Sequence, residues 1–144
     1  MWADTLFALE RGHLLRLALW GGLSVLVGTS LFAWLTIRRV SAPLLRHFAI
    51  QTVAWGTVDL LLCLWASRDL ALRDYAGAQR LLNTLWLNLG LDAGYIAVGV
   101  TLAITAWRWG ARAGGVGAGL GIIVQGVALL LLDLRLLYAI GPMQ

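Results

Sequence analysis

Apolar residues dominate four long stretches of the chain, and short polar segments separate these stretches. They cover residues 14–37, 48–66, 81–107 and 116–140. At 1.5 Å per helical residue, each stretch is long enough to cross about 30 Å of hydrocarbon. A segment in lipid must satisfy its own backbone hydrogen bonds, so each stretch is predicted to form a helix.

The links between these stretches are short, so consecutive helices are predicted to be antiparallel neighbours. The predicted fold is therefore all-α: a polytopic membrane protein built as an antiparallel bundle of four transmembrane helices, with residues 1–144 as a single domain. Pro43 suits the first turn of the second helix. Segments 1–12 and 67–80 are predicted to lie along the membrane interface, with Ser67 as the N-cap of a short helix.

Composition supports a membrane location. The 144 residues are 60% hydrophobic and 12% charged, and their mean hydropathy is +0.82. A soluble domain of this size carries about twice that share of charge, so a soluble globule is excluded. The net charge is +4, and every basic residue is an arginine at or near the end of an apolar stretch. This placement predicts the lipid bilayer as a partner and argues against nucleic acid.

Orientation follows from the charges of the links. The first and third links carry arginines and no acid, whereas the opposite side carries arginines and acids together. We therefore predict a protein integral to the bacterial inner (cytoplasmic) membrane, with the acid-free links inside and both termini outside.

Three acids interrupt the apolar stretches: Asp59, Asp92 and Asp133. A carboxylate at mid-membrane costs about 2.5–3.5 kcal/mol on insertion scales, so such residues pair, bind a ligand or become neutral. Because consecutive helices run in opposite directions, all three acids fall in the half of the bilayer nearest the termini. The sequence thus predicts one polar cluster inside the bundle.

Helical spacing adds polar and aromatic neighbours to these acids. Gln51, Trp55 and Asp59 share one stripe of the second helix, while Asn88, Asp92 and Tyr95 share a stripe of the third. The candidate ligand-binding residues are Asp59, Asp92, Asp133, Trp55, Asn88, Tyr95, Gln51, Gln125 and Asn83. Arg16 and Arg135 are the candidate ion-pair partners of the acids.

Two motifs carry a resemblance. Trp55-Gly56-x-x-Asp59 and Asn88-x-x-Leu91-Asp92-x-x-Tyr95 resemble motifs of an uncharacterised family of small bacterial integral membrane proteins with four helices. The resemblance covers the second and third predicted helices. It implies a shared polar core without implying an activity.

No motif for a cofactor or a metal is present. His13 and His47 are predicted to be interfacial side chains near opposite membrane faces, which leaves no Cys/His set for zinc or haem. The glycines between Gly115 and Gly121, and the pair Gly90 and Gly94, are predicted to let helices approach closely within the bundle or between protomers.

Three functions stay open. In the first, the polar cluster binds or transports a small cation, a proton or an amine-bearing ligand. In the second, the chain is an accessory subunit of a larger membrane complex, and its acids are held in permanent ion pairs. In the third, which the lack of a nucleophile–base pair makes least favoured, two carboxyls act in an intramembrane enzyme. A homo-oligomer with a site shared between protomers fits the small size of the bundle.

Overall fold

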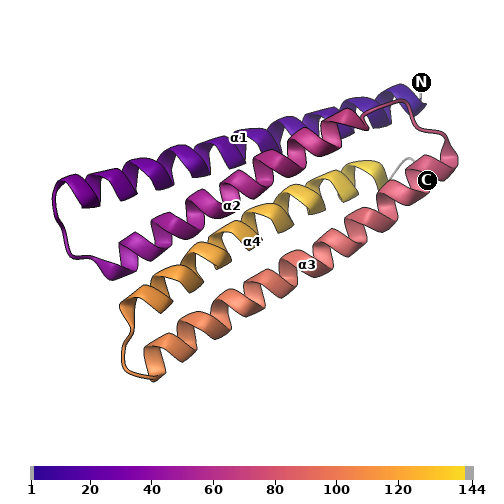
Figure 1. The fold of residues 1–144 in the computed structure, drawn as a ribbon. Helices are drawn as coiled ribbons and strands as arrows, with labels where there is room; N and C mark the ends of the chain where they lie inside the picture. Colours follow the sequence, from indigo (N-terminus) through magenta and orange to yellow (C-terminus); the bar gives the residue numbers. More distant parts are fainter. Residues whose placement is uncertain (1, 142–144) are drawn as a thin grey trace.

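The computed structural model describes residues 2–141 of the chain, and these residues form helices joined by short links (Figure 1). The four helices are α1 (Trp2–Ile37), α2 (Pro43–Arg68), α3 (Tyr75–Arg108) and α4 (Ala113–Ile140). No strand occurs within residues 2–141. The predicted all-α class is confirmed, and all four helices are long and apolar enough to cross a membrane.

Two helices are longer than their apolar stretches. Helix α1 is continuous from Trp2, so the segment predicted to lie along the interface is, from residue 2 on, the first three turns of α1. Helix α3 starts at Tyr75 instead of near residue 81, because Asp74 caps it by accepting a hydrogen bond of 2.7 Å from the Gly77 amide. A carboxylate at this position also suits the positive end of the helix dipole.

The short helix predicted within residues 67–80 is not formed. Ser67 lies in the last turn of α2, where its hydroxyl donates to the Leu64 carbonyl at 2.8 Å, and so it does not cap a new helix. Residues 69–74 form a non-helical link between α2 and α3. Because Asp74 caps α3, residues 75–80 of the predicted interfacial segment are the first residues of α3.

The helices form two antiparallel hairpins, α1 with α2 and α3 with α4 (Figure 1). The hairpins pack through α2 and α4, which run in the same direction, and α1 also contacts α4. Helices α2 and α3 are not among the closely packed pairs, although both border the interior. The bundle is therefore less tightly closed on its α2–α3 side.

Glycines set the close approach within each hairpin. A Cβ at Gly56 would lie 2.8 Å from the Gly21 carbonyl oxygen and 2.7 Å from the Ser24 Cβ. In the other hairpin, a Cβ at Gly119 would lie 2.6 Å from the Gly99 carbonyl oxygen. Gly119 belongs to the glycine stripe that the sequence predicted to pack, and it does so here.

Gly90 and Gly94 behave differently. A Cβ at either position would meet nothing within 4 Å, so this pair forms no helix contact within the described chain.

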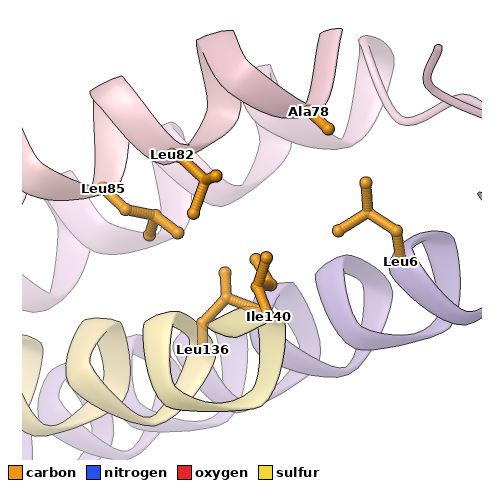
Figure 2. Close-up of a cluster of buried hydrophobic side chains, with 6 residues drawn as sticks. All are labelled: Leu6, Ala78, Leu82, Leu85, Leu136 and Ile140. Atoms are coloured by element: carbon orange, nitrogen blue, oxygen red, sulfur yellow. The ribbon is translucent and has the colours of Figure 1, made fainter. Parts of the chain in front are cut away.

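Buried leucines close the bundle at the end where α1 begins and α4 finishes (Figure 2). They belong to a cluster that joins three helices: Leu6 of α1, Ala78, Leu82 and Leu85 of α3, and Leu136 and Ile140 of α4. Next to this cluster the interior becomes polar. Buried polar side chains lie on every helix, whereas many large apolar side chains face outward. This distribution is typical of helices surrounded by lipid.

Candidate functional site

All four helices line one interior cavity of about 320 Å³. It lies between the leucine cluster of Figure 2 and the middle of the bundle, since Leu85 and Leu136 of that cluster belong to its wall. Its remaining wall is mostly leucine. The polar and aromatic side chains that line it are Glu10, His13, Trp55, Asp59, Trp65, Thr84, Asn88, Asp92, Tyr95 and Asp133.

The structure brings the three predicted acids together in this cavity. Asp59 of α2, Asp92 of α3 and Asp133 of α4 are only 1%, 4% and 6% exposed. The reason is geometric: each acid lies on the inward face of its helix, and the alternating helix directions place all three at a similar depth.

The three carboxyls differ in their partners. Asp133 interacts with His13 of α1, with 3.3 Å between His13 Nε2 and Asp133 Oδ1. Both oxygens of Asp59 are buried and have no hydrogen-bond partner, and the same holds for Oδ2 of Asp92. Leaving a buried polar group unsatisfied costs about 1–3 kcal/mol, so these three acceptor atoms mark a destabilising feature of the isolated chain.

The predicted ion pairs with arginine are absent from the described chain. Arg135 is exposed, because a residue two positions after Asp133 points away from it on a helix. Arg16 extends back along α1, where its Nη1 would lie 3.5 Å from a Cβ at Gly12. Within residues 2–141, neither arginine forms an ion pair with Asp59, Asp92 or Asp133. The acids are therefore not locked by arginine.

An aromatic pair bridges α2 and α3 at the inner end of the cavity. The rings of Trp55 and Tyr95 meet edge to face, with centroids 4.7 Å apart and an angle of 61° between the ring planes. Both residues line the cavity. Such pairs add about 0.5–1.5 kcal/mol beyond the area they bury, and here the contact joins two helices whose backbones do not pack closely.

Three predicted site residues lie outside the cavity. Gln125 is buried in a separate network, where it accepts a hydrogen bond from Trp20 Nε1 at 2.6 Å and donates to Ser24 Oγ at 3.0 Å. Gln51 packs beside Gly121 at the interface of α2 and α4, and Asn83 is exposed. The hydrogen bonds of Gln125 connect α4 to α1. Gln125 lies about 12 Å from Asp133 along the axis of α4, at a rise of 1.5 Å per residue.

Sequence reasoning missed two ionisable residues of the cavity, Glu10 and His13. Both are buried, whereas the sequence predicts that they lie at the membrane interface. The spacing of Glu10, His13 and Leu17 carried the signal, because residues three and four apart share one helix face. That face continues the inward stripe of the first apolar stretch.

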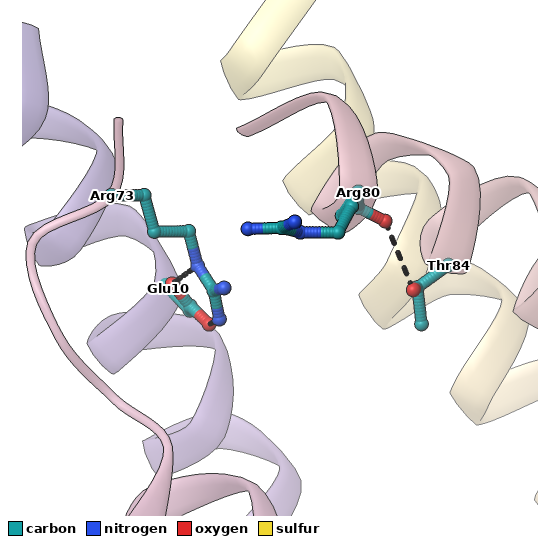
Figure 3. Close-up of polar contacts among 4 residues, drawn as sticks. All are labelled: Glu10, Arg73, Arg80 and Thr84. Carbon is teal, nitrogen blue, oxygen red and sulfur yellow. Dashed lines mark hydrogen bonds and ion pairs between the residues drawn. The ribbon is translucent and has the colours of Figure 1, made fainter. Parts of the chain in front are cut away.

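Glu10 also fastens the link between α2 and α3 to α1 (Figure 3). Arg73 Nε donates to Glu10 Oε2 at 2.8 Å, and Arg73 Nη2 donates to Oε1. This bidentate hydrogen bonding raises the pKa of Arg73 above its usual value. Arg80 extends from the start of α3 toward this pair, and its carbonyl accepts from Thr84 Oγ1 at 3.0 Å.

The site offers hydrogen-bond acceptors and apolar walls. Within residues 2–141, no three His, Cys, Asp or Glu side chains lie close enough together to hold one metal ion. A second hollow, of about 430 Å³, lies on α3 and is lined by Ala97, Val98, Thr101, Leu102 and Thr105. No ionisable side chain lines it.

Fold and site together define an all-helical protein that has four helices able to cross a membrane and buries acids between them. The chain belongs to the family of unknown function DUF6992, whose match covers residues 16–134. This match includes Asp59, Asp92 and Asp133, and the predicted membership of an uncharacterised family is confirmed. No curated protein and no solved structure is detectably similar to this chain.

Proposed function

We propose that this protein is an integral protein of the bacterial inner membrane that binds a small amine-bearing organic cation in the cavity of Asp59, Asp92 and Asp133. In this proposal the four helices span the bilayer as an antiparallel bundle. The links at residues 38–42 and 109–112 face the cytoplasm, since both carry arginine without acid.

The observation that carries the proposal is the lack of partners at Asp59. Its carboxyl is almost completely buried, and neither oxygen accepts a hydrogen bond. Asp92 presents a third unsatisfied acceptor in the same cavity. A ligand that donates hydrogen bonds and carries positive charge would offset the cost of burying these groups.

An organic amine fits this wall better than a bare inorganic cation. Within residues 2–141, no three His, Cys, Asp or Glu side chains form a group that could hold a metal ion, and most of the lining is leucine. A cavity of about 320 Å³ is at the lower end of the range for small-molecule sites. The edge-to-face pair of Trp55 and Tyr95 adds aromatic surface, which attracts cations.

The alternative function, an accessory subunit of a larger membrane complex, requires permanent ion pairs at the three acids. Of these three acids, only Asp133 has an ionisable partner in the described chain, namely His13. Asp59 and Asp92 would require their partners from another protein. Binding of small amines by the purified chain therefore separates the two functions.

The test measures the binding of butylamine and of butanol to the purified protein in lipid nanodiscs by calorimetry. Asp59→Asn and Asp92→Asn keep the side-chain shape and remove the negative charge. A hydrogen bond to a charged group contributes about 1.5–3 kcal/mol, so each variant is expected to bind butylamine about 10- to 150-fold more weakly.

Asp69→Asn is the matched control, because Asp69 lies in the exposed link after α2. It is expected to bind butylamine like the unmodified protein. Unchanged butylamine affinity in both cavity variants would overturn the proposal, and so would equal affinity for butanol.

A further inference from the structure

The cavity has its opening between α2 and α3. Its exposed lining residues all lie on these two helices: Val58, Leu62 and Trp65 on α2, and Thr84 and Leu91 on α3. Every lining residue of α1 and α4 is buried or half-buried. Helices α2 and α3 are not a closely packed pair, and the cavity meets its surroundings between them.

This opening is lateral. Its rim residues lie along the sides of α2 and α3, within the apolar stretches that are long enough to cross a membrane. Four of them are large and apolar, and Val58, Leu62, Trp65 and Leu91 are 40% to 66% exposed. At the end of the bundle where α1 begins, the leucine cluster and the bidentate contact of Glu10 with Arg73 cover the interior. Lipid chains, and not bulk water, would therefore adjoin the opening.

The cavity changes in character from its rim to its floor. Four of the five rim residues are apolar, whereas the floor holds Asp59 and Asp92, which are both more than nine-tenths buried. Both oxygens of Asp59 and one oxygen of Asp92 lack a donor. Three unsatisfied oxygens require N–H or O–H donors, and a primary ammonium group carries three N–H donors. A quaternary ammonium group would supply charge without a donor.

We propose that the ligand is an amphiphile with a primary amine, which enters sideways from the bilayer between α2 and α3. Its ammonium group lies against Asp59 and Asp92, and its alkyl chain passes between Leu62 and Leu91 into the lipid. This inference rests on the proposed function and narrows it to a ligand class and a route.

The experiment compares dodecylamine, dodecyltrimethylammonium and butylamine, each radiolabelled, on the protein in nanodiscs. Leu62→Trp and Leu91→Trp place a bulky ring at the rim, where both side chains are exposed and the fold tolerates a larger residue. Leu61→Trp and Leu87→Trp are the matched controls, because these leucines are exposed on the same helices and do not line the cavity.

The rim variants are expected to weaken dodecylamine binding about tenfold and to change butylamine binding by less than about twofold. Each methylene held by apolar wall contributes about fourfold in affinity, so displacing two of them suffices for this loss. The control variants are expected to bind all probes like the unmodified protein. Dodecyltrimethylammonium is expected to bind at least about tenfold more weakly than dodecylamine, because it has no N–H donor.

Two results would overturn the lateral route while leaving the proposed function in place. One is that rim and control variants bind dodecylamine equally well while Asp59→Asn loses butylamine binding. The other is a disulfide between copies carrying Leu62→Cys in a Cys63→Ser background, since a second copy would then cover the opening. If Asp59→Asn changes the affinity for neither dodecylamine nor butylamine, the proposed function and this inference fail together.

Discussion

Replacing Asp59 by leucine should stabilise the protein when no ligand is present. Leucine and aspartate have the same branched shape, since two methyl groups take the places of the two carboxyl oxygens. Neither oxygen of Asp59 accepts a hydrogen bond, so Asp59→Leu removes a buried unsatisfied group without breaking a contact. Relieving such a group is worth about 1–3 kcal/mol of unfolding free energy.

The same exchange at Asp133 should have the opposite sign. The Asp133 carboxyl lies 3.3 Å from His13 Nε2, so Asp133→Leu leaves the imidazole buried without its partner. That loss costs about 1–3 kcal/mol. The two variants are therefore expected to differ by about 2–6 kcal/mol, although the chemical change and the cavity are identical.

The assay is reversible unfolding of the purified protein from mild micelles by increasing fractions of sodium dodecyl sulfate, followed by tryptophan fluorescence. Thr57→Val, at an exposed position of α2, gives the baseline for a polar-to-apolar change on the outer surface. Equal destabilisation by Asp59→Leu and Asp133→Leu would refute the reasoning, because Asp59 would then have a permanent partner. The accessory-subunit function would gain support from that result.

Three further predictions concern packing and polar contacts. Gly56→Ala should lower the unfolding free energy by about 1–3 kcal/mol, because the new Cβ would meet the backbone of α1. Gly90→Ala should not lower it in the same unfolding assay, because the new Cβ would meet open space. Gln125→Leu should cost about 1–3 kcal/mol, because two buried groups lose their partner, and an unchanged midpoint would contradict the polar network. Glu10→Gln should release the link of Arg73 and speed trypsin cleavage there, and it should lower the unfolding free energy by about 1.5–3 kcal/mol, because the buried Glu10 carboxylate loses its charge toward Arg73. Cleavage at an unchanged rate would show that this contact does not hold the link.

Helix number and the depth of the acids could be predicted from the sequence. Four apolar stretches of sufficient length predicted four helices, and Asp59, Asp92 and Asp133 occupied comparable distances along them. The position of each acid along its helix follows from the residue count and the fixed rise per residue, so it can be predicted without knowing the neighbouring helices. The helix starts were less predictable, because a single cap such as Asp74 decides where a helix begins.

The partners of the acids could not be predicted in the same way. Arg16 lies at a suitable depth, yet its side chain extends along α1 instead of toward an acid. His13 was assigned to the interface and instead contacts Asp133. Which long side chain reaches which acid depends on the rotation of each helix and on rotamers, and neither is encoded in the spacing of one segment.

Residue order alone specifies the elements of this protein: helices long enough for a bilayer, the order of their links, and acids at one level. How those elements meet depends on the packed bundle. It paired Asp133 with His13, left Asp59 without a partner, excluded Asn83 from the cavity and kept α2 and α3 apart. Periodicity assigns a face to each helix in isolation, whereas contacts between helices arise from the packing of glycines and side chains far apart in the chain.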